Sequence, residues 1–304
     1  MKKVTRVVLS VIILIVWMLA IMPFIRNSEK SELTNATQAK MTGKFVTLSY
    51  GKTHYQLNGA ANGKVVILIH GFSVPMYIYD STFQALTHAG FRVLRFDLWG
   101  RGYSSRPKTN YDLALFVQQT REIIDSLHLT TPVDLVGTSM GGTIVAGFAD
   151  KYPGLVRKVV LIDPHALKKN ITPLNIPILG DYYAAAFWMK ALPQSQLSDF
   201  YLPYRHPDWP ARYAEQMQYK GFRRAIVSTA RNILHQDFLT TYQKLHSFPI
   251  LLIWGTSDKT IPKTEIDTLR KLLHPEFMPI DKAGHLPLLE QPTLVNNRLI
   301  AFLK

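Results

Sequence analysis

The chain opens with one long apolar run. Residues Val7 to Ile25 include a single polar side chain, Ser10, and the next charge is Arg26. These 19 residues would form a helix ~28 Å long, close to the ~30 Å hydrocarbon thickness of a bilayer. A run that is apolar on every face and is followed by a polar stretch is not typical of a core helix. We predict a transmembrane anchor over residues 1–26 and a linker over 27–40.

A cleaved signal peptide is the alternative for this run. Its apolar region would be shorter and would end in a small-x-small site, which the stretch from Leu19 to Phe24 does not offer. The flanking charges bear on orientation: Lys2, Lys3 and Arg6 precede the run, and Arg26, Lys30, Lys40 and Lys44 follow it. The very short basic tail favours a cytoplasmic N-terminus, so we expect a single-pass protein with its body outside the cytoplasm.

From Lys44 onward, short apolar runs alternate with longer amphipathic stretches. The runs are rich in β-branched residues and apolar on both faces, which is typical of parallel strands covered by helices on both sides. The predicted strands are 65–69, 92–96, 133–136, 158–162, 250–254 and a short one at 276–280, and the predicted helices are 80–89, 112–127, 140–152, 263–273 and 292–302. Residues 44–50 and 54–57, joined near Gly51, predict an antiparallel pair. The pattern indicates an α/β fold with a mostly parallel sheet.

Between Pro164 and Pro249 the alternation stops. The intervening residues show helical periodicity, no strand pattern and many aromatic side chains. Long insertions inside compact domains are commonly functional lids. We therefore predict a core of residues 41–164 and 249–304 and a helical cap of residues 165–248, inserted after the sixth strand. Its aromatic side chains would line an apolar pocket or form the cap's own core.

Composition removes several classes of function. The 304 residues are 47% hydrophobic and 18% charged, and they include no cysteine, so disulfide frameworks, thiol nucleophiles and cysteine-ligated metals are excluded. The net charge of +14 would suit nucleic acid or an anionic membrane surface. No recognisable nucleic-acid module carries that charge, whereas the predicted cap is basic, so a membrane surface is the better interpretation.

A candidate nucleophile follows the predicted strand 133–136. Gly137-Thr138-Ser139-Met140-Gly141 fits G-x-S-x-G, and Gly142 extends it at the start of a predicted helix. In this context the serine occupies a sharp strand-to-helix turn with its hydroxyl exposed, and the glycines avoid a clash. The helix N-terminus also favours developing negative charge. Ser139 is therefore the predicted nucleophile.

An acyl-transfer serine needs a base and a carboxylate that orients it. Asp258 follows the strand that ends at Trp254, and His285 follows the short strand 276–280, so both lie at the carboxyl edge of the sheet. Asp163 also ends a strand and is the rival acid, although a turn residue before Pro164 has an ordinary structural role. We predict that His285 is the base and Asp258 the acid.

Backbone donors for an oxyanion are expected beside the serine. The N–H of Met140, directly after the nucleophile, is one. The loop that begins His70-Gly71-Phe72 would supply the other, from Phe72 or alternatively Ser73, because Gly71 permits close backbone approach. For His70 itself we expect a buried, hydrogen-bonded role in holding that loop.

Together these motifs make the chain from Lys44 to Lys304 resemble the α/β-hydrolase superfamily, and within it the capped serine hydrolases, which include carboxylesterases, monoacylglycerol lipases and carbon–carbon bond hydrolases. The segments that support the resemblance are His70-Gly71-Phe72, 97–104, 137–142, 162–164, 254–258 and 284–292. Haloalkane dehalogenases and epoxide hydrolases are similar but have Asp at the elbow, so Ser139 argues against both. Trp99 departs from the pattern of many relatives.

The resemblance implies hydrolysis of a carboxylic ester through an acyl-enzyme, with no cofactor and no metal. An apolar acyl ester of lipid type, such as a monoacylglycerol, is the expected small-molecule substrate, since the cap is aromatic and the anchor keeps the site near lipid. Carbon–carbon bond hydrolysis, lactone hydrolysis and perhydrolysis are alternatives on the same residues. A non-catalytic, membrane-tethered binding protein is an alternative of another class. No oligomeric state is predicted.

Overall fold

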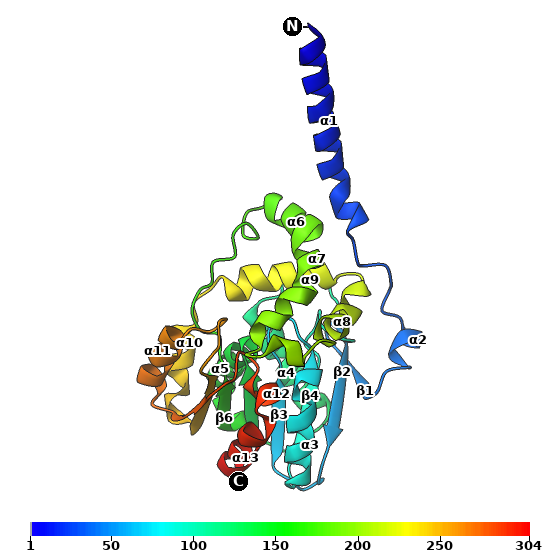
Figure 1. The fold of residues 1–304 in the computed structure, drawn as a ribbon. Helices are drawn as coiled ribbons and strands as arrows, with labels where there is room; N and C mark the ends of the chain where they lie inside the picture. The colour runs from blue at the N-terminus through cyan, green and yellow to red at the C-terminus, as the bar shows by residue number, and fades with distance from the viewer. Residues whose placement is uncertain (1) are drawn as a thin grey trace.

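The computed structural model describes residues 2–304, and within them one eight-stranded sheet forms the centre of the molecule (Figure 1). Its spatial order is β1-β2-β4-β3-β5-β6-β7-β8. The strands are β1 (Lys44–Leu48), β2 (Gly51–Asn58), β3 (Val65–Ile69), β4 (Arg92–Phe96), β5 (Val133–Thr138), β6 (Val156–Ile162), β7 (Ile250–Gly255) and β8 (Glu276–Ile280). The sequence therefore predicted the strands of the core to within a few residues at each end.

Strand directions match the hydrophobic pattern. β1 pairs antiparallel with β2 and β2 antiparallel with β4, whereas every pair from β4 to β8 is parallel. The chain runs outward from β3 to β4 and then returns to place β5 on the other side of β3. At such a reversal the crossovers diverge and leave a crevice above the carboxyl ends of the strands. The α/β fold with a mostly parallel sheet is confirmed.

Helices cover both faces of the sheet. Alternate residues of one strand enter different cores: Ile67 packs in the core that includes α4, α5 and α11, and Leu68 packs in the core that includes α3 and α13. The helices are α1 (Lys2–Ile25), α2 (Asn35–Gln38), α3 (Asp80–His88), α4 (Leu113–Ser126), α5 (Met140–Lys151), α6 (Leu179–Tyr183), α7 (Met189–Ser195), α8 (Trp209–Ala214), α9 (Phe222–Thr229), α10 (Leu239–Gln243), α11 (Lys263–Leu273), α12 (Pro287–Glu290) and α13 (Pro292–Leu303).

Between β6 and β7 the chain forms the predicted helical cap, from α6 to α10, and its described residues include no strand. The cap lies over the carboxyl ends of the sheet strands (Figure 1). Several of its aromatic side chains are buried in the core shared with α3 and α13: Phe200, Trp209, Tyr213 and Phe222. These side chains therefore belong to one apolar core that the cap shares with the hydrolase core, rather than to a core of the cap's own.

Helix α1 projects from the body (Figure 1), and most side chains of Val4–Ile25 are exposed. Residues Val4–Ile25 are long and apolar enough to cross a membrane, and none of that stretch is buried in the protein. A helix of this kind can serve as an anchor or as a signal sequence. The segment that follows is not a free tether: Ser31 forms a β-bridge with Tyr219, and the amide of Arg223 donates to Glu29 Oε1 at 2.6 Å.

Candidate active site

Ser139 occupies the turn between β5 and α5, with φ 55° and ψ −123°. A side chain other than glycine rarely adopts positive φ, so the turn is strained and is held by its surroundings. The Ser139 amide donates to Ile162 O at 2.8 Å. A Cβ on Gly137 would lie 2.3 Å from Gly141 O, and one on Gly141 would lie 2.1 Å from Ile69 O. A side chain at either position would overlap these backbone atoms, so both positions require glycine.

His285 and Asp258 lie together at the same edge of the sheet. His285 Nδ1 is 2.8 Å from Asp258 Oδ2, and both side chains are buried. Asp258 Oδ1 accepts the amide N–H groups of Thr260 and Ile261, so both carboxylate oxygens have partners. Burial opposes ionisation, but the charge and hydrogen bond of His285 outweigh it and lower the pKa of Asp258. Burial also disfavours the imidazolium, yet Asp258 raises the pKa of His285 above its usual value.

Asp163, the rival acid, occupies the turn after β6 but forms no direct bond to His285 within the described residues. Its Oδ1 accepts the Gly255 amide at 3.0 Å. Burial, followed by the nearby charge of Asp258, raises the pKa of Asp163 well above its usual range. The pKa values of the two neighbouring carboxyl groups are therefore shifted in opposite directions, down for Asp258 and up for Asp163.

Ser139 and His285 line one pocket of 270 Å³, and its walls are largely apolar. A Cβ on Gly71 would lie 3.2 Å from Ser139 Cβ, so the loop that carries Phe72 runs directly beside the serine. Met140 begins α5 and is buried. His70 is buried behind the loop: its ring contacts Gly71 O at 2.9 Å and accepts the Leu98 amide. Burial lowers the pKa of His70 to about 4, so the ring is neutral, as its expected structural role requires.

Arg101 was not predicted to belong to the site, yet it is fully buried between the cap and this loop. Its guanidinium donates to the uncharged oxygens of Phe72 (2.8 Å), Trp99 (3.2 Å) and, on cap helix α9, Thr229 (2.8 Å). Burial lowers the pKa of Arg101 to about 10, so the group still carries its charge at neutral pH. The glycine-flanked turn around residue 101 was a signal for a loop, but nothing in it indicated that the arginine points inward.

Trp99, the departure from the family pattern, is fully buried. Its ring lies edge-on to Tyr50 at 5.3 Å, and its amide donates to the Gln119 side chain. Its indole N–H has no partner among the described residues. The ring therefore fills the core beneath the turn at residues 97–104.

Three further titratable side chains line the pocket, none of them predicted as site residues: Asp199, His165 and Lys169. Asp199 comes from the cap; its carbonyl accepts the His285 amide at 2.7 Å, and burial raises the pKa of its carboxyl group. Burial lowers the pKa of His165 to about 4. Lys169 Nζ lies 2.5 Å from Glu265 Oε2. These three groups add titratable side chains to a largely apolar pocket wall, and their positions could not be inferred without the path of the cap.

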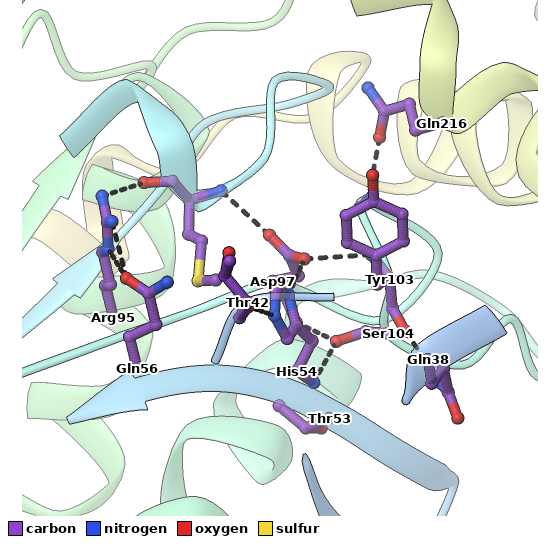
Figure 2. Close-up of polar contacts among 12 residues, drawn as sticks. Gln38, Thr42, Thr53, His54, Gln56, Arg95, Asp97, Tyr103, Ser104 and Gln216 are labelled. Carbon is purple, nitrogen blue, oxygen red and sulfur yellow. Dashed lines mark hydrogen bonds and ion pairs between the residues drawn. The ribbon is translucent and has the colours of Figure 1, made fainter. Parts of the chain in front are cut away.

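A second buried histidine–carboxylate pair lies outside this site (Figure 2). His54 Nδ1 is 2.8 Å from Asp97 Oδ2, and His54 Nε2 is 2.7 Å from Thr42 O. Both ring nitrogens face acceptors, which only the doubly protonated ring can satisfy. Burial opposes that charge, but Asp97 outweighs it and raises the pKa of His54. Asp97 also accepts the amides of Met76 and Tyr103, so this pair holds the turn of the 97–104 motif.

Asp163, Asp258 and His285 are a group of potential metal ligands whose ligand atoms lie within 4.8 Å of one another. Both oxygens of Asp258 and the Nδ1 of His285 are already engaged in hydrogen bonds. The set is therefore better suited to orienting an imidazole than to binding an ion.

Comparison with known proteins agrees with the fold. The family described as alpha/beta hydrolase fold matches residues 64–292. The chain is 25% identical over 274 residues to Lipase 1 of Psychrobacter immobilis, covering 81% of this chain and 79% of that protein. It is 26% identical over 273 residues to carboxylesterase YbfK of Bacillus subtilis, covering 85% and 86%. The enol-lactonase from Burkholderia xenovorans LB400 has a similar structure, with TM-score 0.74 at 21% identity, covering 86% and 99%.

The family match covers most of the sheet, including β3 to β8, together with the cap and the segments that carry Ser139, Asp258 and His285. It ends beyond the loop that holds His285. The chain therefore belongs to the α/β hydrolase fold family and is a hydrolytic enzyme.

Proposed function

We propose that the protein is a serine esterase that cleaves carboxylic esters with an apolar acyl group, such as monoacylglycerols. The observation that carries this proposal is the buried 2.8 Å contact between His285 and Asp258 on the wall of a pocket that Ser139 also lines. The names of the lipase and the carboxylesterase among its relatives favour the same reaction class. The apolar pocket wall, which includes Phe72, Ile78 and Leu286, suits an acyl chain.

The proposed chemistry has two halves. Ser139 Oγ bonds to the ester carbonyl carbon while His285 takes the hydroxyl proton, and Asp258 stabilises the resulting imidazolium. The N–H groups of Phe72 and Met140 receive the oxyanion. The carbon–oxygen bond to the alcohol then breaks, and His285 returns its proton to the leaving alkoxide. Water next attacks the acyl-enzyme and gives a proton to His285, which passes it to Ser139 as the acid leaves.

The first test is covalent labelling of the full chain by a fluorophosphonate probe, with Ser139→Ala as the matched variant. Labelling of the wild type and none of Ser139→Ala is expected, since the probe reports an activated serine. An unlabelled wild type, beside a serine hydrolase that labels in the same tube, would support a non-catalytic binding protein instead.

A panel of p-nitrophenyl esters of rising chain length then tests the reaction class. We expect turnover that increases with acyl length until the pocket is filled. If the wild type labels but turns over no ester, carbon–carbon bond hydrolysis, lactone hydrolysis or perhydrolysis on the same residues becomes the better assignment.

The choice of acid is tested by two isosteric variants. Asp258→Asn should lower kcat by about 10⁴-fold, because the imidazole loses its orienting charge and correct tautomer. Asp163→Asn should keep kcat within about tenfold of wild type, because Asp163 Oδ1 accepts the Gly255 amide instead of contacting His285, and Asn keeps that acceptor. The reverse ranking of the two variants would make Asp163 the acid.

We further propose that α1 is an uncleaved, single-pass anchor and that the catalytic domain is extracytoplasmic. The length and apolar character of Val4–Ile25, none of which is buried in the protein, support an anchor, and the basic residues before it support this orientation.

A further inference from the structure

The cap contacts α1 near the helix's carboxyl end, where α6 lies beside it (Figure 1). The Tyr182 hydroxyl donates to Leu19 O at 2.9 Å. Arg26, directly after the apolar span, donates to Ala186 O at 2.9 Å and lies over the Phe187 ring at 5.5 Å. The cap is therefore held against the last turns of the candidate membrane helix, not below its end.

These contacts fix the depth of the cap if α1 spans a bilayer. The span Val4–Ile25 has 22 residues and is ~33 Å long, slightly more than the ~30 Å hydrocarbon layer. Leu19 lies six residues before Ile25, which corresponds to ~9 Å along the helix axis. Since the helix exceeds the hydrocarbon layer by only ~3 Å, the Tyr182 hydroxyl lies about 6–9 Å inside the hydrocarbon boundary, within the ~5–10 Å depth that interfacial segments reach.

The segment at this depth, Ile176–Phe187, is here called the cap tip, and its surface suits that layer. Its exposed apolar side chains are Ile176 (40% exposed), Ile178 (85%), Leu179 (50%) and Phe187 (37%). The whole stretch 170–189 contains one charged residue, Asp181. Asp181 is paired with Arg231 at 3.1 Å. A cluster of apolar side chains of this size in water is unfavourable, whereas in a bilayer interface it is expected.

Ile178 is the most exposed member, and its backbone is strained to present it. It has φ 63° and ψ −55°, and the Leu179 amide donates back to Pro177 O at 2.6 Å, which closes a γ-turn. A β-branched residue with positive φ is a rare conformation. Nothing in the described protein covers the side chain that this turn projects. Contact with lipid would give the strained, exposed tip a favourable environment.

Basic side chains adjoin the cap tip. Arg223, Arg224 and Arg231 line a hollow that also includes Glu29, from the segment after α1, and Asp181, from α6. These three arginines, here called the arginine rim, outnumber the two carboxylates beside the apolar tip. An excess of positive charge there favours an anionic leaflet, because the head groups and the acyl layer are contacted together.

We propose that the cap tip docks into the interfacial layer of the bilayer that α1 spans, with the arginine rim against anionic lipid head groups. The inference rests on the proposed anchor and adds a second membrane contact to it. Two contacts hold the cap in one orientation on the surface, so that an acyl ester can reach the pocket without crossing bulk water.

The absence of cysteine from the chain allows a direct test with single-cysteine variants of the full-length protein. An environment-sensitive fluorophore is attached at Ile178→Cys in the cap tip, at Val11→Cys in α1 and at Leu294→Cys as the matched control. Leu294 is an exposed leucine (51%) on α13, in the hydrolase core rather than the cap. Each variant is reconstituted in phosphatidylcholine vesicles with or without phosphatidylglycerol, some containing spin-labelled lipid as quencher.

We expect blue-shifted, lipid-quenched emission at positions 11 and 178 and water-like emission at 294, with stronger quenching at 178 when phosphatidylglycerol is present. If the probe at position 11 is quenched by lipid but the probe at position 178 has water-like emission, the docking is overturned and the anchor stands. Water-like emission at 11 would overturn the anchor, and the docking with it. The hydrolase assignment is untouched by either result, since it is tested by labelling of Ser139.

A second measurement separates docking from a general structural role. The double variant Ile178→Asp, Leu179→Asp should lower turnover of a long-chain ester presented in vesicles by about tenfold or more, while turnover of a soluble butyrate ester stays unchanged. Leu294→Asp should change neither rate. Equal losses on both substrates, or no loss on vesicles, would contradict the proposal.

Discussion

At the scale of single residues, the site depends on charges whose positions the fold determines. The charge and hydrogen bond of His285 lower the pKa of Asp258 despite its burial, whereas burial and the charge of Asp258 raise the pKa of Asp163. The same residue type thus has its pKa shifted in opposite directions at two neighbouring positions. The proposed roles follow from these surroundings, not from residue type alone.

The pH dependence of activity follows from His285. The base must be neutral to accept a proton, so activity is lost as pH falls through its pKa. That pKa is raised above the ordinary 6.5 by Asp258 and, to a smaller extent, by Asp199. We expect the acidic limb of kcat/KM to have its midpoint above pH 6.5 in the wild type, and at a lower pH in Asp199→Asn. Profiles of ester hydrolysis between pH 5 and 9 measure the midpoints of the wild type and of Asp199→Asn. A wild-type midpoint below pH 6.5 would be inconsistent with stabilisation of the His285 imidazolium by Asp258.

The contribution of His54 to stability should be lost as pH rises, whereas activity is lost as pH falls. Its pKa in the folded protein is raised above 6.5 by Asp97, against burial and the nearby charge of Arg95. Its contribution is therefore fully present below pH 6.5 and is lost as pH rises through the folded-state pKa. The difference in Tm between wild type and His54→Gln should shrink from pH 6 to pH 9. A difference that stays constant over this range would mean that the ring is not charged.

At the scale of elements, Arg101 joins three parts of the molecule. Its guanidinium binds the loop at Phe72, its own turn at Trp99 and cap helix α9 at Thr229. It is buried in an aromatic setting, with the Phe116 ring 5.2 Å away. This arrangement holds the loop that would supply an oxyanion donor at a fixed distance from Ser139.

Replacing that guanidinium should therefore affect catalysis more than binding. Arg101→Met removes the donors to Phe72 O and lets the loop shift, and a displacement of about 1 Å can cost about 10²-fold in rate. We expect kcat on a butyrate ester to fall by roughly that factor with a smaller change in KM. Arg101→Lys, which keeps the charge but not the planar fork, should recover part of it. A folded Arg101→Met variant, checked by its Tm, with wild-type kcat would contradict this role.

At the scale of the whole molecule, the apolar helix α1 lies on the side of the cap that faces away from the sheet (Figure 1). The first 40 residues contain six basic and two acidic side chains, a net +4 out of +14, and they flank the apolar helix. The cap lies between that helix and the sheet (Figure 1). A body held below a membrane by both α1 and its cap would present the pocket close to the lipid surface.

Membrane topology provides the whole-molecule prediction. In intact expressing cells, a membrane-impermeant maleimide should label Lys304→Cys, at the end of the catalytic domain, and should label Lys2→Cys only after permeabilisation. The isolated protein should retain α1 by mass, because the stretch Leu19 to Phe24 lacks a cleavage site. Labelling of Lys2→Cys alone in intact cells would invert the orientation, and loss of α1 would mean a signal peptide.

The core strands could be predicted because a buried parallel strand is a short β-branched run with few alternatives. Strand ends were less certain: β5 extends to Thr138 and β6 begins at Val156, since backbone pairing continues past the apolar residues that identified them. Residues 27–40 have a polar linker composition, yet Glu29 and Ser31 bind the cap. Composition does not show such contacts, because they depend on where the partner backbone lies.

The sequence by itself determined the α/β class, the apolar N-terminal helix and the local turn that presents Ser139, because periodicity, length and glycine spacing act over neighbouring residues. Only the tertiary structure decided that Asp258, rather than Asp163, contacts His285, that Arg101 points inward to hold Phe72, and that the cap tip lies level with the end of α1. Those outcomes depend on contacts between segments far apart in the chain. Such contacts are set by how sheet, cap and helix pack together, which no local pattern encodes.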